Sequence, residues 1–132
     1  MDRTERLTIT GLTQLATLRG HIRALLSGCD TDEVIDAMLV ADELCGLVCQ
    51  YGNVPAEVTL TRASDRPGLR VAVVAPLLEV PVPPVWSRAG ARVLQGCATD
   101  WGMSNRGTLM TLWASVRLRS RADLPVPRGP VR

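Results

Sequence analysis

Four cysteines are the residues of this chain with the most evident chemistry, and two of them stand close together. Cys45 and Cys49 fall within the stretch 43–52, ELCGLVCQYG. Their spacing differs from the Cys-x2-Cys knuckle that wraps a zinc ion, and Cys29 and Cys97 are distant in the sequence. The pair also falls in the C-terminal half of an expected helix, where the helix dipole disfavours a thiolate. We therefore expect these cysteines to pack in a core, with metal or redox chemistry as the alternative.

The basic residues exclude several kinds of catalytic site. All 15 are arginine, because the chain of 132 residues contains no lysine. A P-loop, or any mechanism that needs a catalytic lysine, is therefore excluded. The single histidine, His21, leaves little material for a histidine-based metal site or a Ser-His-Asp triad. We expect it to be a surface or half-buried side chain of a helix.

Hydrophobic periodicity and turn residues predict the elements that must position any site. Helices are expected from residue 13 or 14 to 26, from residue 30 or 31 to the glycine stop at 51–53, and over about 87–99. Strands are expected at 6–10, 57–62, 69–75, 101–104 and 108–117. The strand over 69–75 is apolar on both faces and should be central, whereas the proline-rich stretch 76–84 should be irregular.

These elements predict an α+β fold, a two-layer sandwich in which three helices pack on one face of a mostly antiparallel, five-stranded sheet. One domain should cover residues 1–118, and the arginine- and proline-rich end, 119–132, should be disordered. The polar start of the chain and the lack of an apolar run of about 18 residues predict a cytoplasmic protein without membrane contact.

Charge gives little indication of a nucleic-acid partner. The formal net charge is +2, although arginines gather near the C-terminus. Such a tail can contact a nucleic acid or an acidic partner, but a solvated tail is the simpler interpretation. We expect no direct binding of nucleic acid.

Four blocks of sequence, in order, resemble the small histidine-kinase-like ATPase domains of bacterial anti-sigma factor serine kinases (the GHKL or Bergerat fold). Residues 39–52, LVADELCGLVCQYG, are similar to the helix pattern L-x-x-x-E-L-x-x-N-A-x-x-H-G. Residues 69–75 resemble the central strand, 88–102 the segment G-R-G-L-x-L-V-x-x-L-A-x-x-W-G, and 111–113 the closing T-V-W strand. The resemblance covers about residues 5–117.

The departures from this family fall on positions to which the resemblance assigns nucleotide chemistry. Glu43 matches the general base of active members, but the Mg²⁺-binding asparagine falls on Leu47 and the following histidine on Tyr51. The adenine-contacting aspartate falls on Ala75. Leucine offers Mg²⁺ no oxygen and places apolar surface beside the triphosphate, and alanine leaves the adenine amine without an acceptor.

The lid and the closing strand depart from the pattern as well. Of the G-R-G-L motif only the second glycine, Gly90, remains, and Ala91 follows it. The proline-rich stretch 76–84 replaces the glycines after the aspartate, and it offers fewer backbone N–H donors to phosphate. Thr111 matches the final threonine, but the Gly-Lys before it is absent. The resemblance thus implies a degenerate ATP pocket, formed by Glu43, Leu47, Tyr51, Ala75, Gly90, Ala91 and Thr111.

The expected function is that of a nucleotide-dead relative, a pseudokinase that sequesters a protein partner without a metal or nucleotide cofactor. The resemblance implies a bacterial sigma factor or a STAS-type anti-anti-sigma protein as the partner, and a homodimer. It also makes Arg19 and Arg23 of the first helix candidate partner contacts, with a solvated helix face as the alternative. Three other functions stay open. One is a divergent serine kinase that uses ATP and Mg²⁺ with Glu43 as base, and another is a module that binds a different small ligand in the old pocket. The third is nucleic-acid binding through the arginine-rich tail.

Overall fold

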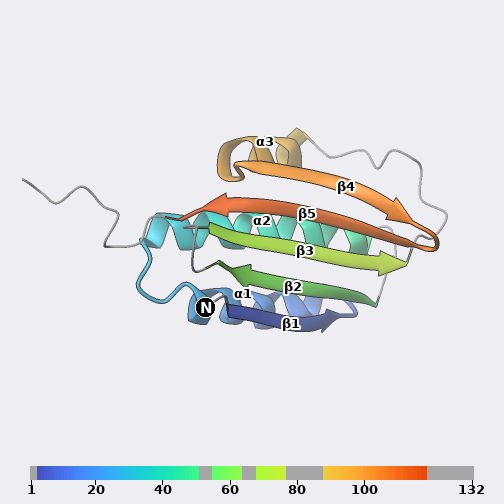
Figure 1. Ribbon diagram of the computed structural model, residues 1–132, viewed down its shortest axis with the longest axis horizontal. Coiled ribbons are helices and arrows are strands. Elements are labelled where there is room, and N and C mark those ends of the chain that lie inside the picture. The colour runs from blue at the N-terminus through green and yellow to red at the C-terminus, as the bar shows by residue number, and fades with distance from the viewer. Residues whose placement is uncertain (1–2, 51–54, 64–67, 77–87, 119–132) are drawn as a thin grey trace, which may run out of the picture.

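The structure is a computed structural model that describes residues 3–50, 55–63, 68–76 and 88–118 (Figure 1). Its strands are β1 (Arg3–Ile9), β2 (Ala56–Arg62), β3 (Gly68–Pro76), β4 (Asp100–Arg106) and β5 (Leu109–Arg117). Its α-helices are α1 (Leu15–Leu25), α2 (Thr31–Gln50) and α3 (Arg88–Cys97). A short 3-10 helix, Leu12–Gln14, precedes α1.

The five strands form one antiparallel sheet in the order β1-β2-β3-β5-β4, and the helices form a second layer on one of its faces (Figure 1). Buried residues alternate with more exposed ones along β3 and β5. Because successive side chains of a strand point to opposite faces, this alternation distinguishes a helix-covered face from an open face. The predicted α+β fold is confirmed, including the central place of β3.

Helix α2 is the main buried helix, and the residues at its start explain where it begins. It starts at Thr31 and carries Asp32 and Glu33 in its first turn, where a negative charge stabilises the helix dipole. The amide of Val34 donates to the carbonyl of Asp30 at 3.1 Å and closes that turn. The predicted start of this helix is therefore confirmed.

Several element ends differ from the prediction because tertiary contacts decide them. Strand β1 begins at Arg3 because it pairs with β2 along its whole length, with Arg3 opposite Arg62. Helix α3 ends at Cys97, since the amide and hydroxyl of Thr99 both donate to the carbonyl of Ser115, at 2.8 and 3.1 Å. Strand β4 continues to Arg106, before a turn at Gly107 with a positive φ of 61°.

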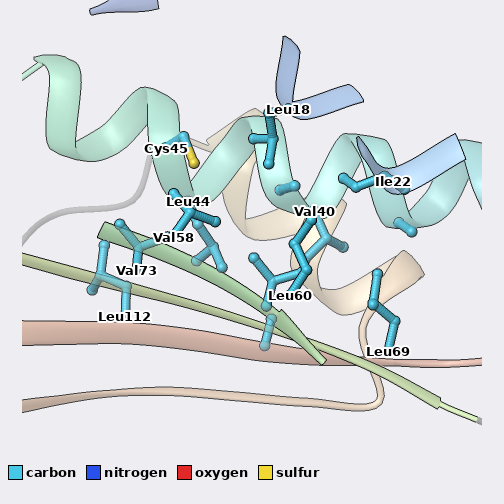
Figure 2. Close-up of a cluster of buried hydrophobic side chains, with 14 of the residues drawn as sticks. Leu18, Ile22, Val40, Leu44, Cys45, Val58, Leu60, Leu69, Val73 and Leu112 are labelled. Atoms are coloured by element: carbon cyan, nitrogen blue, oxygen red, sulfur yellow. The ribbon is translucent and has the colours of Figure 1, made fainter. Parts of the chain in front are cut away.

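A single hydrophobic core fills the space between the sheet and the helices (Figure 2). Its largest side chains come from the three α-helices, from four strands and from the residues that directly follow α1 and β5: Ile9, Leu18, Ile22, Leu25, Leu26, Val40, Leu44, Leu60, Leu69, Leu94, Leu112 and Leu118. No aromatic side chain of the described residues belongs to this core, and the chain contains no phenylalanine. Most of the predicted proline-rich stretch and the predicted tail, residues 77–87 and 119–132, lie outside the described residues.

Candidate functional site

The centre of the candidate site is the C-terminal half of α2. Glu43 and Leu47 are four residues apart and therefore lie on the same side of the helix. Leu47 is only 5% exposed and belongs to the hydrophobic core. Glu43 is half-buried, and this burial raises the pKa of its carboxyl group. One side of α2 thus combines a carboxyl group that is more readily protonated than usual with an apolar neighbour.

Ala75 lies near the C-terminal end of β3 and faces the helices. It is 1% exposed and is part of the same core as Leu47. The resemblance assigns a Mg²⁺ ligand to position 47 and an adenine contact to position 75. This chain has apolar side chains at both positions, and they pack in the protein interior. Neither side chain can donate or accept a hydrogen bond or ligate a cation.

Thr111 lies on the other face of the sheet. Its neighbours in β5, Met110 and Leu112, are 3% and 0% exposed and point into the core. Strand alternation therefore directs Thr111 to the open face, where it pairs with Val74 of β3. The structure does not bring Thr111 together with Glu43, Leu47 and Ala75.

Of the three remaining positions of the expected ATP pocket, the structure describes two. Gly90 and Ala91 lie in the first turn of α3, and Tyr51 lies outside the described residues. Helix α3 packs against α2, where the thiol of Cys97 donates to Oδ1 of Asp36 at 3.4 Å. This contact places α3 on the side of α2 that carries Asp36.

Cys45 packs in the core as predicted (Figure 2). It is fully buried, and burial raises the pKa of its thiol to about 12. Cys29, Cys49 and Cys97 are half-buried, and burial raises their thiol pKa values too. All four are free thiols. Within the described ranges, no group of three or more histidine, cysteine or acidic side chains could hold a metal ion.

The two candidate partner contacts on α1 have different surroundings. Arg19 forms an ion pair with Asp42 of α2, with Nη2 2.7 Å from Oδ2 and Nε 2.9 Å from the same oxygen. Asp42 raises the pKa of this guanidinium through hydrogen bonding and charge. Arg23 is exposed in the last turn of α1. Arg19 thus links two helices, whereas Arg23 is accessible to a partner.

His21, also on α1, is half-buried as predicted, and its Nδ1 lies 2.5 Å from Oε1 of Glu5 in β1. The partners of Arg19 and His21 were not foreseen in the sequence, because they depend on how α1 sits against α2 and β1. Asp42 could have been suspected as a partner, since it is an acid within a largely apolar helix.

An unexpected groove lies on the open face of the sheet, at the end of the sheet where β3 begins and β5 ends. Its volume is about 510 Å³. The lining residues are Thr61, Ala63, Gly68, Leu69, Arg70, Thr99, Ser115, Val116 and Arg117. The guanidinium of Arg70 stacks over the ring of Trp113, 4.5 Å from its centroid. Periodicity alone could not reveal this groove, because it depends on the register between strands.

No helix in the described part of the chain is long and apolar enough to span a membrane.

The comparisons with known proteins identify the fold but no family. Neither the family models nor the curated protein sequences match this chain. Among solved structures, the fold is similar to the crystal structure of the RsbU and RsbW domains of Rv1364c from Mycobacterium tuberculosis. The TM-score is 0.67 at 18% sequence identity, and the match covers 88% of this chain and 32% of the other. The chain therefore spans about a third of the length of that two-domain structure.

Proposed function

We propose that this protein is a regulatory module of the anti-sigma type that binds a protein partner in the bacterial cytoplasm and has lost ATP binding and kinase activity. The partner is a sigma factor or a STAS-type anti-anti-sigma protein, and the module acts by sequestering it. The protein forms a homodimer, as the resembled family does. No nucleotide or metal cofactor takes part, so exchange of partners depends on competition and not on phosphorylation.

The burial of Leu47 is the observation that carries this proposal. The side chain at the position of the family's Mg²⁺-binding asparagine is part of the hydrophobic core. Mg²⁺ requires oxygen ligands in a near-octahedral arrangement, and a buried leucine supplies none. The buried Ala75 adds to this argument, because it provides no acceptor for the adenine amine.

Two further findings support the regulatory class. The four sequence blocks resemble anti-sigma factor serine kinases, and the fold is similar to a structure that contains an RsbW domain. The exposed Arg23 on α1 gives the module a charged side chain for partner contact, whereas Arg19 contributes by holding α1 against α2.

A divergent serine kinase is the second candidate, and the retention of Glu43 favours it. The carboxyl group is half-buried on the side of α2 that carries Leu47. Burial raises its pKa, a shift that is common for general bases of enzymes. In this case the protein would bind Mg-ATP and phosphorylate a STAS-type partner.

Calorimetric titration of Mg-ATP into the purified protein separates the two candidates. We expect no binding tighter than roughly 1 mM, and no transfer of radiolabelled phosphate to STAS proteins of the source organism. The matched control is Glu43→Gln, which removes the base and keeps the shape of the side chain. The regulatory proposal predicts that both proteins behave alike in these assays.

The partner arm of the experiment uses sigma factors and STAS proteins of the source organism, each immobilised and tested for binding of the purified protein. We expect one of them to bind with the same affinity in the presence and absence of Mg-ATP. Submillimolar binding of Mg-ATP together with phosphate transfer that Glu43→Gln abolishes would establish the kinase instead.

A further inference from the structure

The outer edge of β4 has no partner strand among the residues that the structure describes. β4 is the last strand of the sheet, and β5 is its one neighbour within the described ranges. Its seven residues, Asp100–Arg106, are all exposed except Gly102, which is half-buried. The free N–H and C=O groups of such an edge are a template for another strand, so natural proteins usually cover or disrupt it.

The charges of β4 are arranged to match a second copy of the same strand. When two copies run antiparallel and overlap fully, Met103 lies opposite Met103, and Asp100 lies opposite Arg106 at both ends. Opposite charges directly across an antiparallel pair stabilise it. A shift by two residues in either direction places Ser104 opposite Asp100 or Gly102 opposite Arg106, and both ion pairs are lost. The fully overlapped register is therefore the favoured one.

Apolar side chains of β4 support the same register. Trp101 and Met103 are 37% and 36% exposed and point to the helix side of the sheet, because their partners in β5, Ala114 and Leu112, face the core. In the overlapped register the two Met103 side chains meet at the symmetry axis, at the short spacing of directly opposed residues. Pairing would therefore remove apolar surface from water.

The opposite edge of the sheet lacks this complementarity. β1 is the other outer strand, and its central residue is Arg6. Full antiparallel overlap of two β1 strands would place Arg6 opposite Arg6 and Arg3 opposite Ile9. Like charges directly opposite each other destabilise a strand pair. The two edges therefore differ in their fitness for self-pairing.

We propose that the protein dimerises through β4, which pairs antiparallel with β4 of a second copy and joins the two sheets into one. The two-fold axis passes through Met103 and stands perpendicular to the sheet, so the helices of both copies lie on the same side. The proposed function includes a homodimer, and the β4 edge is the surface that we assign to it. The assignment rests on the proposed function only in that a homodimer forms.

Charge reversal at the two ends of β4 tests the interface by sedimentation velocity of the full chain over a range of concentrations. We expect the wild-type protein to be dimeric. Asp100→Arg and Arg106→Asp should each replace both ion pairs by like-charge contacts and raise the dimer dissociation constant at least about tenfold. An equimolar mixture of the two variants should restore the dimer. In the mixed dimer, a strand with arginine at both ends faces a strand with aspartate at both ends.

The control is Arg6→Asp, the same kind of reversal on the exposed edge of β1, which should leave the dissociation constant unchanged. Circular dichroism checks that each variant is folded. A dimer that tolerates both β4 reversals, or a mixture that stays monomeric, overturns the interface. A wild-type protein that is monomeric throughout overturns the interface and the homodimer, whereas the partner-binding assay tests sequestration separately.

Discussion

Packing between Gly102 and Trp113 accounts for the glycine and the tryptophan at two positions of the sequence motifs. They lie opposite each other in β4 and β5, on the open face of the sheet. A Cβ atom at position 102 would lie 2.8 Å from the indole ring of Trp113, closer than such atoms approach. The ring therefore occupies the space that a side chain at position 102 would need. The guanidinium of Arg70 also covers the ring through a cation–π contact.

Substitution of Gly102 by alanine should destabilise the protein. The new methyl group must displace the indole ring, and overpacking of this kind costs about 1–3 kcal/mol of unfolding free energy. Urea denaturation measures the loss. In the background of Trp113→Ala, the same substitution should cost much less, because the clashing ring is gone.

Gly20→Ala is the matched control. Position 20 lies within α1, and a Cβ there meets no atom within 4 Å. Alanine favours a helix over glycine by about 0.5–1 kcal/mol, so this variant should be more stable than the wild type. Equal effects of the two glycine substitutions would contradict the packing argument.

Among the elements, α2 connects the other helices. Asp42 holds α1 through Arg19, and Asp36 contacts α3 through the thiol of Cys97. The remaining side of α2 packs on the sheet through residues such as Val40 and Leu44 (Figure 2). The position of α1, and therefore of its exposed residues, depends on this one helix.

Arg23 on α1 should contact the protein partner if the proposed function is correct. Its replacement by alanine should raise the dissociation constant of the captured sigma factor or STAS protein about tenfold, the range of an interface arginine that matters. Surface plasmon resonance measures the change. Arg92→Ala, at an exposed position of α3, is the control and should bind as the wild type does. Unchanged affinity of Arg23→Ala would remove α1 from the interface.

At the scale of the whole molecule, helices and sheet share one continuous core. Side chains of α1, α2, β2, β3 and β5 meet in it (Figure 2). A domain of this size with one core usually unfolds in a single cooperative step. The ionisation of a buried group in the core should therefore change the stability of the entire domain.

Cys45 makes this dependence measurable at alkaline pH. Burial raises the pKa of its thiol from 9.0 to about 12. Between these values the unfolded chain has lost the proton and the folded chain keeps it, so the free energy of unfolding falls as pH rises. Below pH 9 the thiol is protonated in both states, and its full contribution to the free energy of unfolding is present. Above pH 9 the free energy of unfolding decreases by about 1.4 kcal/mol per pH unit on account of this thiol.

Urea unfolding between pH 8 and 10.5 should therefore show a shallower loss of stability in Cys45→Ala than in the wild type. Cys49→Ala is the control, because that thiol is half-buried and should change the slope less. Parallel alkaline losses in the wild type and Cys45→Ala would show that Cys45 is not the group responsible.

The sequence alone was sufficient for the order and type of the regular elements and for the central place of β3. Helical and alternating apolar spacing is a local property, and the turn residues near Gly52, Gly68 and Gly107 separate the segments clearly. The start of α2 was predictable for the same reason, because capping and early acidic residues act within one helical turn. The packing role of Cys45 also followed from its place on an apolar helix face.

Only the tertiary structure decided which side chains face one another. The packing of the helices on one face of the sheet leaves Thr111 on the opposite, open face, away from Glu43 and Leu47. The packing of α1 on α2 assigns Arg19 to Asp42 and leaves Arg23 accessible. These pairings join residues distant in the chain, and their energies depend on register and helix orientation. Local sequence patterns contain neither quantity, whereas they do contain the periodicity from which the fold was predicted.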